Sequence, residues 1–380
     1  MSKISVKRHS IILFIVIAVL LQFGCKKSIN SSDIDVEAEI LKEMQDNRIP
    51  SVVAAIVKDN EIVWEGTFGL ADVESSKPTD RLTLYNIESI SKLFVSISVF
   101  QLWEDDRIDL YSDINEYLPF TVRNPNYPDI AITPHMLLNH TSSLAWPVQT
   151  EDHLPDFEYF FDLDNVPPIS EWIPQYILAN GLDYRPAVWK DFRPGSQELY
   201  SNIGVSLLAL IIENITGMDY RDYCRENILL SLDMENSAFR PEYMNEELLV
   251  TPYYNSNYPV KQFTYRHYPA GNIKSNIVDF SHFISAILNF GELNGNRILK
   301  PETVEQMFKI NNYATGMSNL WNRRLGNRIA KYGGGTGYSA FVEWQFDSDI
   351  GFIIFSNKYN ESVYPHGRIY DLIRYQSNNY

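Results

Sequence analysis

The stretch Glu88-Ser89-Ile90-Ser91-Lys92, with the apolar residues that follow it, decides the fold. Leu93, Phe94, Val95 and Ile97 make the next segment apolar nearly all round, which predicts a buried helix over Ser91–Trp103. If Ser89 opens that helix, Lys92 lies one turn further along on the same face. A lysine at the start of a buried helix needs a partner, because an unpaired buried charge is costly. Taken alone, the segment also fits a capped helix with a surface lysine.

The pairing of Ser89 with Lys92 indicates nucleophilic chemistry. A serine hydroxyl is a weak nucleophile near neutral pH and needs a base within hydrogen-bond reach. Lysine has a pKa near ~10.4, but burial or a neighbouring cation lowers that pKa and makes the amine a base. The start of a helix also offers backbone N–H groups to a developing oxyanion.

Two further segments contain candidate site residues. In Pro194-Gly195-Ser196-Gln197-Glu198-Leu199-Tyr200-Ser201-Asn202, Pro-Gly marks a turn, Tyr200 lies in the connecting loop and Asn202 begins the next helix. In Lys331-Tyr332-Gly333-Gly334-Gly335-Thr336-Gly337, just before a predicted strand, the glycines permit close approach of backbone to a ligand. The first segment also fits a turn with a helix cap, and the second fits a tight bend or bulge. The glycine spacing differs from that of a dinucleotide loop.

In this order, the three segments resemble the serine β-lactamase and penicillin-binding-protein superfamily, especially class C β-lactamases and related esterases and D-aminopeptidases. That superfamily carries Ser-x-x-Lys, then Tyr-x-Asn, then Lys-Thr-Gly or His-x-Gly. The resemblance covers about residues 35–375, and the connecting segments Ile132–Leu144, Pro269–Asn272 and Asn294–Leu299 support it.

The resemblance implies a role for each candidate residue. Ser89 is the acylated nucleophile, Lys92 and Tyr200 share the proton transfers, and the N–H groups of Ser89 and Gly334 form the oxyanion hole. Lys331 also orients Tyr200, and Asn202 holds Lys92. The implied substrate-binding residues are Asn202, Lys331, Gly333 and Gly334. No cofactor is implied.

Three departures from the family pattern leave the substrate class open. Tyr332 replaces the usual Thr, the run Gly335-Thr336-Gly337 lacks a Pro, and Glu198 stands where relatives carry an aromatic residue. A shift of register by one would put Tyr332 itself at the third-motif position. His140 is expected to support a buried turn rather than take part in chemistry.

The resulting hypothesis is a serine hydrolase that acts through an acyl-Ser89 intermediate on an ester, amide, D-amino-acid peptide or β-lactam. Because the bulky Tyr332 alters the edge that would contact a β-lactam carboxylate, esters and peptides are expected as substrates ahead of β-lactams. The alternative is a non-hydrolysing envelope protein that keeps the fold as a receptor for peptidoglycan or β-lactams. In either case the aromatic stretch 145–192 covers the site, or else packs within the helical part.

Hydrophobic patterning predicts an α+β fold, with an antiparallel sheet flanked by terminal helices plus a helical subdomain. A hairpin near the start and two strands near the end are expected to join one sheet. The α/β part is predicted over about 35–94 and 270–380, and the helical part over about 95–269. The predicted terminal helices are Asp35–Asn47 and Gly367–Tyr375, and the predicted strands are Val52–Val57, Ile62–Phe68, Tyr338–Phe346 and Ile350–Phe355.

Charge and histidine spacing argue against two classes of binding partner, nucleic acids and metal ions. The 380 residues carry a formal charge of −16, which repels phosphate backbones and argues against nucleic-acid binding. The seven histidines show no metal-ligand spacing, so no metal site is predicted. We expect a monomer acting on a small molecule or peptide.

The beginning of the chain resembles a targeting segment. A basic start and an 11-residue apolar run, Ile11–Leu21, predict a signal peptide over residues 1–24. Cys25 after Gly24 resembles the lipidation site of a bacterial lipoprotein, and polar residues 25–34 predict a tether. The expected location is the bacterial cell envelope, lipid-anchored to the membrane. An uncleaved anchor or ordinary secretion is the alternative.

Overall fold

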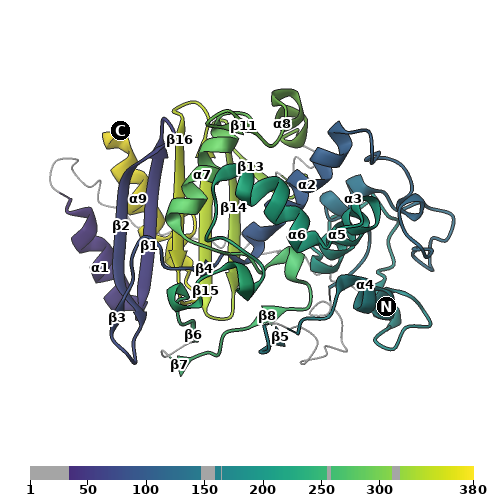
Figure 1. The fold of residues 1–380 in the computed structure, drawn as a ribbon, viewed down its shortest axis with the longest axis horizontal. Helices are drawn as coiled ribbons and strands as arrows, with labels where there is room; N and C mark the ends of the chain where they lie inside the picture. The colour runs from purple at the N-terminus through teal and green to yellow at the C-terminus, as the bar shows by residue number, and fades with distance from the viewer. Residues whose placement is uncertain (1–33, 147–158, 164, 255–257, 310–316) are drawn as a thin grey trace, which may run out of the picture. The chain divides into compact units, whose positions relative to one another are not determined.

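An eight-stranded antiparallel sheet joins the two ends of the folded chain (Figure 1). Its strand order is β12-β13-β14-β15-β16-β1-β2-β3. Strand β1 (Ser51–Lys58) pairs with β2 (Glu61–Asp72) along one edge and with β16 (Ile350–Ser356) along the other. Asp59 and Asn60 between β1 and β2 have φ of +51° and +67°, as a tight hairpin turn of this hand requires. The predicted antiparallel sheet built from both ends of the chain is confirmed.

This computed structural model describes residues 34–146, 159–163, 165–254, 258–309 and 317–380. Residues 36–380 form one compact unit. The predicted signal peptide, Cys25 and all but the last residue of the predicted tether lie outside the described residues.

The remaining strands of the sheet are β3 (Lys77–Pro78), β12 (Met317–Ser318), β13 (Trp321–Arg324), β14 (Arg328–Gly335) and β15 (Tyr338–Gln345). Strand β14 differs from the sequence-based expectation, which placed the glycine-rich segment before a strand. The glycines lie within β14, and Thr336-Gly337 forms the two-residue connection to β15. The alternation of apolar and polar residues did not reveal this strand, because Gly333 to Gly335 contribute no side chains to either face.

Helices cover both faces of the sheet, which explains why β1 and β16 are apolar apart from their terminal polar residues. Helix α7 (Ile277–Leu288) packs against β1 and β16 on one face. Helices α1 (Val36–Asn47) and α9 (Arg368–Gln376) pack together on the other face. Side chains of β15 alternate accordingly: Trp344 donates its indole N–H to Ile284 of α7, whereas Phe341 packs against Tyr370 of α9.

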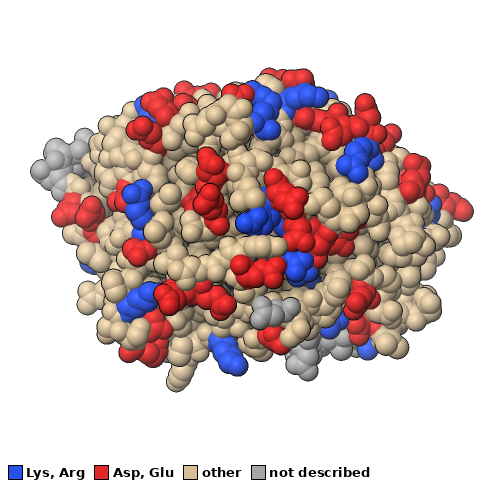
Figure 2. All heavy atoms as spheres, viewed as in Figure 1, with Lys and Arg blue, Asp and Glu red and all other residues tan. Residues whose placement is uncertain are grey.

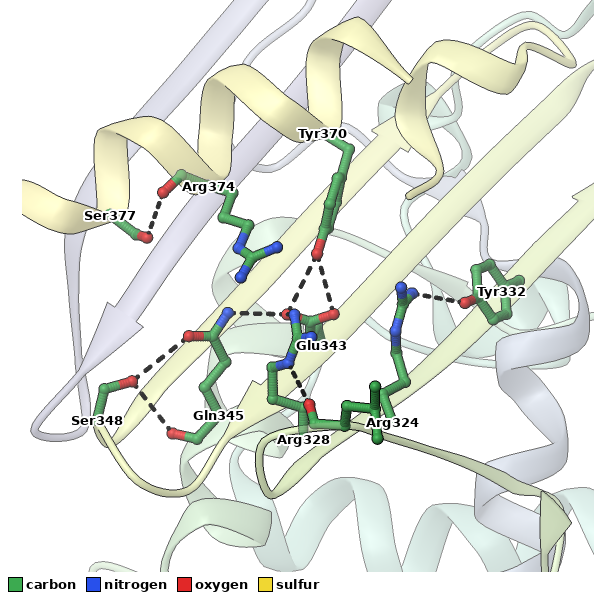
Figure 3. Close-up of polar contacts among 10 residues, drawn as sticks. Arg324, Arg328, Tyr332, Glu343, Gln345, Ser348, Tyr370, Arg374 and Ser377 are labelled. Atoms are coloured by element: carbon green, nitrogen blue, oxygen red, sulfur yellow. Dashed lines mark hydrogen bonds and ion pairs between the residues drawn. The ribbon is translucent and has the colours of Figure 1, made fainter. Parts of the chain in front are cut away.

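A buried polar cluster fixes α9 on the sheet (Figure 3). Glu343 of β15 is completely buried and accepts hydrogen bonds from the Tyr370 hydroxyl at 3.2 and 3.4 Å. Its carboxylate also pairs with Arg328 at 3.5 Å and accepts from the Gln345 amide at 2.8 Å. A buried carboxylate needs such partners, so removing one of them would leave a costly unpaired charge.

The helical part lies beside the sheet and consists of α2 (Lys92–Glu104), α3 (Pro134–Leu138), α4 (Ile169–Ile177), α5 (Asn202–Thr216) and α6 (Tyr220–Cys224). Helix α8 (Pro301–Met307) packs on α2. Short two-residue strands form four small ladders: β4 (Tyr85–Asn86) with β9 (Lys274–Ser275), β5 (Tyr159–Phe160) with β8 (Thr264–Tyr265), β6 (Tyr253–Tyr254) with β7 (Tyr258–Pro259), and β10 (Glu292–Leu293) with β11 (Asn296–Arg297).

The visible surface carries charged side chains of both signs (Figure 2). Figure 2 shows acidic side chains spread over the visible face, with Lys and Arg side chains lying among them rather than in one continuous patch. Within the described ranges no single helix has the length and apolarity of a membrane span; the bent pair 202–216 and 220–232 meets that test by length and composition only.

Candidate active site

Ser89 lies where the sheet meets the helical part. It belongs to a short 3₁₀ turn, Glu88–Ser91, that leads into α2 and packs against β14. Residues i and i+3 of such a turn lie above one another, so Ser89 and Lys92 are aligned. The Lys92 Nζ and the Ser89 Oγ are 2.8 Å apart. Ser91 anchors the turn, because its hydroxyl accepts a hydrogen bond from the Ile273 backbone N–H at 3.1 Å.

Tyr200 reaches the same hydroxyl from the opposite side. Its phenol oxygen lies 2.8 Å from the Ser89 Oγ. The loop that carries Tyr200 is held by His140, whose Nδ1 accepts from the Ser201 N–H at 3.2 Å and whose carbonyl accepts from Leu199 at 2.6 Å. The His140 ring also packs on the Tyr200 ring at 4.5 Å. His140 therefore supports a buried turn, as its sequence context predicts.

The surroundings of Lys92 favour a neutral amine. Burial, chiefly, and the nearby Lys331 charge lower the pKa of Lys92 well below its ordinary value, and only the Glu88 carboxyl opposes them. The Lys92 Nζ also donates to the Ala270 carbonyl at 2.5 Å. Burial raises the pKa of Tyr200 above its usual range, so its hydroxyl keeps a proton near neutral pH. The triad can therefore hold one basic amine and one proton donor around Ser89.

Strand alternation separates Lys331 from Tyr332. Lys331 is buried on the side of the nucleophile, where its Nζ donates to the Leu320 carbonyl. Burial lowers the pKa of Lys331 to about 7, with Glu198 acting in the opposite direction. Tyr332 lies on the α9 side, where its hydroxyl accepts from Arg324 at 2.7 Å and its ring packs on Phe341 (Figure 3). The bulky ring therefore does not narrow the site.

The glycines of β14 allow the strand to lie directly against the Ser89 turn. A Cβ at Gly333 would come within 2.3 Å of the Ile87 carbonyl oxygen, which no side chain could tolerate. A Cβ at Gly334 would meet the Tyr364 hydroxyl at 2.7 Å, and that hydroxyl donates to the Gly333 carbonyl. These positions thus keep the backbone close to the nucleophile.

A cavity of about 250 Å³ opens beside Ser89. Its lining consists of Glu88, Ser89, Trp146, Tyr200, Asn202, Tyr265, His267, Ala270, Gly271, Gly334 and Gly335. Asn202 begins α5, and its buried Oδ1 has no hydrogen-bond partner among the described residues, so it is free for a ligand. Among the described residues of the aromatic stretch 145–192, Trp146 reaches the cavity, whereas Trp172 and Trp189 pack in the helical core.

The structure thus brings together most of the residues selected from the sequence. Ser89, Lys92 and Tyr200 are in direct contact, and Asn202 and Gly334 line the cavity. Lys331 and Gly333 lie close behind it, outside the lining. Glu88, Tyr265 and His267 line the cavity without having been predicted; the only sequence signal was an acidic residue directly before the nucleophile. Within the described part of the chain, no three His, Cys, Asp or Glu side chains cluster as metal ligands.

Comparison with known proteins shows the family to which the chain belongs. The sequence model of the family described as Beta-lactamase matches residues 36–374. The chain belongs to the β-lactamase family. Within the family, it is 30% identical over 268 residues to Beta-lactamase-like protein 2 of Dictyostelium discoideum, covering 67% of this chain and 45% of that protein. It is 26% identical over 211 residues to Protein flp of Staphylococcus aureus (strain MRSA252), covering 56% of this chain and 39% of that protein.

The β-lactamase-family chain therefore spans less than half the length of these two relatives. A solved β-lactamase/D-alanine carboxypeptidase from Pseudomonas syringae has the same fold, with a TM-score of 0.69 at 18% identity over 90% of this chain and 97% of that one. Family membership supports a serine-hydrolase type of function.

Proposed function

We propose that this chain hydrolyses esters or peptides through an acyl-enzyme formed on Ser89. One observation carries the proposal: the Ser89 Oγ lies 2.8 Å from both the Lys92 Nζ and the Tyr200 hydroxyl. A serine held between a depressed-pKa amine and a protonated phenol has both a proton acceptor and a proton donor within reach.

The proposed acylation begins with transfer of the Ser89 proton to the neutral Lys92 amine. The serine oxygen then bonds to the substrate carbonyl carbon, and the carbonyl oxygen becomes an oxyanion. As the carbon–leaving-group bond breaks, Tyr200 gives its proton to the departing alcohol or amine, and the proton held by Lys92 returns to Tyr200. In deacylation, water attacks the same carbon, gives up its proton to this pair and releases Ser89 with its hydroxyl restored.

The oxyanion is proposed to rest on the backbone N–H groups of Ser89 and Gly334. Gly335 and Tyr338 flank the two-residue connection between β14 and β15, and they form a hydrogen-bonded pair of the ladder. Hydrogen-bonded and non-hydrogen-bonded pairs alternate along antiparallel strands, so the N–H of Gly334, one position earlier, points away from β15. On that side β13 has already ended: it pairs with Arg328 to Ala330 only. The N–H of Gly334 is therefore available at the wall of the cavity.

Esters and peptides rank ahead of β-lactams in this proposal. A β-lactam carboxylate needs a cation or hydroxyl at the strand edge beside the nucleophile. Lys331 donates to Leu320 behind that edge, and Tyr332 lies on the opposite face of the strand. Neither residue lines the cavity among the described residues.

An uncharged fluorophosphonate probe tests the proposal. Intact mass after incubation should show one adduct on the wild-type chain and none on Ser89→Ala, and turnover of p-nitrophenyl esters should vanish in the same variant. A receptor that keeps the fold without hydrolysis would bind ligand reversibly and show no turnover. Absence of both labelling and turnover in the folded wild-type chain would reject the hydrolase.

We also propose that Cys25 carries a lipid that holds the domain at the envelope membrane. The support is the apolar run Ile11–Leu21 with Gly24-Cys25 shortly after it. Cys25→Ala should move the protein from the membrane fraction to the soluble fraction, whereas the equally conservative Cys224→Ala should not. A native N-terminus at Met1 by mass spectrometry would reject lipidation.

A further inference from the structure

One wall of the cavity is built by four side chains in a row that the proposed acylation mechanism does not use. Glu88 accepts hydrogen bonds from the Tyr265 hydroxyl at 3.1 and 3.0 Å. The Tyr265 ring stacks on the His267 ring at 4.8 Å, and His267 meets the Trp146 ring edge-to-face at 5.6 Å. All four residues line the cavity beside Ser89.

Glu88 is held in this wall by specific features. It is 3% exposed and has a φ of +50°, a left-handed conformation that is unfavourable for a glutamate. The Asn86 amide donates to its Oε1 at 2.9 Å. Gly335 leaves the space for the carboxyl, because a Cβ there would lie 2.7 Å from the Glu88 Oε2.

The Glu88 carboxyl retains capacity for another donor. A carboxylate offers about four acceptor sites, and the described partners are Asn86 and Tyr265 only. Lys274 attracts the carboxyl electrostatically, but its Nζ donates to the Asn272 Oδ1 at 2.7 Å instead. Burial raises the pKa of Glu88 to about 8, which indicates that the buried charge lacks full compensation in the free protein.

His267 packs against two aromatic rings, but its ring nitrogens lack hydrogen-bond partners among the described residues. The residue is 2% exposed. Burial lowers the pKa of His267 to about 3, so the ring is neutral and presents one acceptor nitrogen. A buried polar group aimed at a cavity without a partner points to a ligand that completes it.

Among the described residues, the lining has one ionisable carboxyl, that of Glu88, and no Lys or Arg side chain to pair with it. Glu88 holds a proton in the free chain near pH 7, and an ammonium group beside it would lower the pKa of Glu88 and replace that proton. An anionic group would meet the Glu88 carboxyl without a counter-ion. A cation would meet the carboxyl, the acceptor nitrogen of His267 and the faces of Trp146 and Tyr265, which attract cations through their π-systems.

We propose that this wall, defined by Glu88, Tyr265, His267 and Trp146, is a recognition site for an ammonium group. The inference rests on the proposed function and names its substrate class: esters or peptides with a free, protonated amine close to the scissile carbonyl. Because Glu88 directly precedes Ser89 in the chain, the amine lies only a few bonds from the acylated carbon. The cavity volume of about 250 Å³ suits a small side chain.

Three substrates that differ only in the group on the alanine nitrogen test the proposal at pH 7: alanine p-nitroanilide, its N-acetyl derivative and its N-succinyl derivative, each as both enantiomers. The wild-type kcat/KM should be at least tenfold higher for the ammonium substrate than for the neutral one, and lowest for the anionic one. Glu88→Gln should reduce the ammonium preference tenfold or more, with a smaller effect on the neutral substrate.

Glu213→Gln is the matched control. It neutralises another carboxyl whose pKa is raised by burial, on α5 and outside the cavity lining, so the ammonium preference should survive. If Glu88→Gln lowers kcat/KM equally for all three substrates, or if the wild-type chain prefers the anionic one, the recognition site is rejected.

A measurement on the wild-type chain alone covers the case in which Glu88→Gln does not fold. Alaninamide should slow fluorophosphonate labelling of Ser89 at least tenfold more than N-acetylalaninamide at equal concentration; equal slowing overturns the proposal. If Ser89 cannot be labelled at all, the hydrolase fails separately. Calorimetric titration with the same two amides then decides the ammonium site, since tighter binding of alaninamide supports it and equal affinity refutes it.

Discussion

The hydroxyl oxygens of Ser89 and Tyr200 lie 2.8 Å apart although 111 residues separate them in the chain. The two side chains come from different structural parts: Ser89 from the turn against β14, Tyr200 from the loop that opens α5. Any change in the packing of the helical part against the sheet would alter this distance. The proposed chemistry therefore depends on the fit between the two parts.

Tyr200→Phe should slow acylation and deacylation while leaving the fold intact. The ring remains and packing barely changes, but the proton donor is lost, and such groups contribute about 10²–10⁴-fold. Single-turnover kinetics and a thermal melt measure the two effects. Tyr176→Phe, which removes another buried hydroxyl, bonded to the Ala145 carbonyl, should leave the rate unchanged. Near-normal rates in Tyr200→Phe would leave Lys92 as the sole proton carrier.

Ser89→Ala and Ser91→Ala should separate chemistry from stability. The first should abolish covalent labelling with little change in melting temperature. The second should retain labelling but melt at a lower temperature, because it leaves the buried Ile273 N–H without its acceptor, at a cost of about 1–3 kcal/mol. Labelling that survives in Ser89→Ala would mean that another residue is the nucleophile.

Lys331→Met should move the acidic limb of the pH–rate profile to higher pH. The Lys331 charge helps to lower the pKa of Lys92, so its removal raises that pKa and leaves less neutral amine at a given pH. Lys358→Met is a suitable control, because the Lys358 amine bonds the Asn47 and Arg48 carbonyls at the surface. An unshifted limb in Lys331→Met would show that Lys92 does not limit the rate.

Glu88 should make the folded chain less stable as pH rises from 5 to 7. Burial raises the pKa of Glu88 from 4.5 to about 8, so the folded chain holds a proton that the unfolded chain releases in this range. Proton uptake on folding means that stability falls with increasing pH. Glu88→Gln has no such proton and should show a smaller fall in melting temperature. Lys274 and Lys331, whose pKa values burial lowers to about 7, act with the opposite sign mainly above this range. His267, whose pKa burial lowers from 6.5 to about 3, acts with the opposite sign below pH 6.5 in both chains, so the difference between the two chains carries the Glu88 contribution.

If the melting temperatures of the wild-type chain and of Glu88→Gln fall equally with pH, then Glu88 does not hold an additional proton in the folded chain. The comparison is independent of any substrate, so it tests the electrostatics of the wall without assuming its role in recognition.

Local signals account for the parts of the fold that the sequence predicted. The turn at Asp59-Asn60 and the apolar strands around it specify the first hairpin, and apolar periodicity specifies α1, α5 and α9. Strands β12 and β13 carry no such signal, because they are short and Asn322, Arg323 and Arg324 interrupt the apolar pattern. Their place in the sheet depends on pairing with β14.

The site was predictable in two ways: from local spacing for Ser89 and Lys92, and from the family resemblance for the distant Tyr200, Asn202 and Gly334. Ser89 and Lys92 share a turn, so their contact follows from helical geometry. The wall beside them could not be inferred in the same way. Glu88 and Tyr265 are 177 residues apart and meet only because β4 pairs with β9 and the following turn packs on β14. Nothing in the local sequence of His267 marks it as part of a cavity.

The central position of β1 has a consequence for how this protein is made. Within the described sheet, the first strand in chain order pairs with the last: β1 lies beside β16, and the Ser51 N–H donates to the Asn357 side chain, 306 residues later. Before β16 has paired with it, β1 has one unpaired edge, which can pair with strands of other chains. Contacts so distant also slow folding. A chain that lacks β16 should therefore aggregate rather than fold, and the nucleophile should become reactive only once β16 has paired with β1.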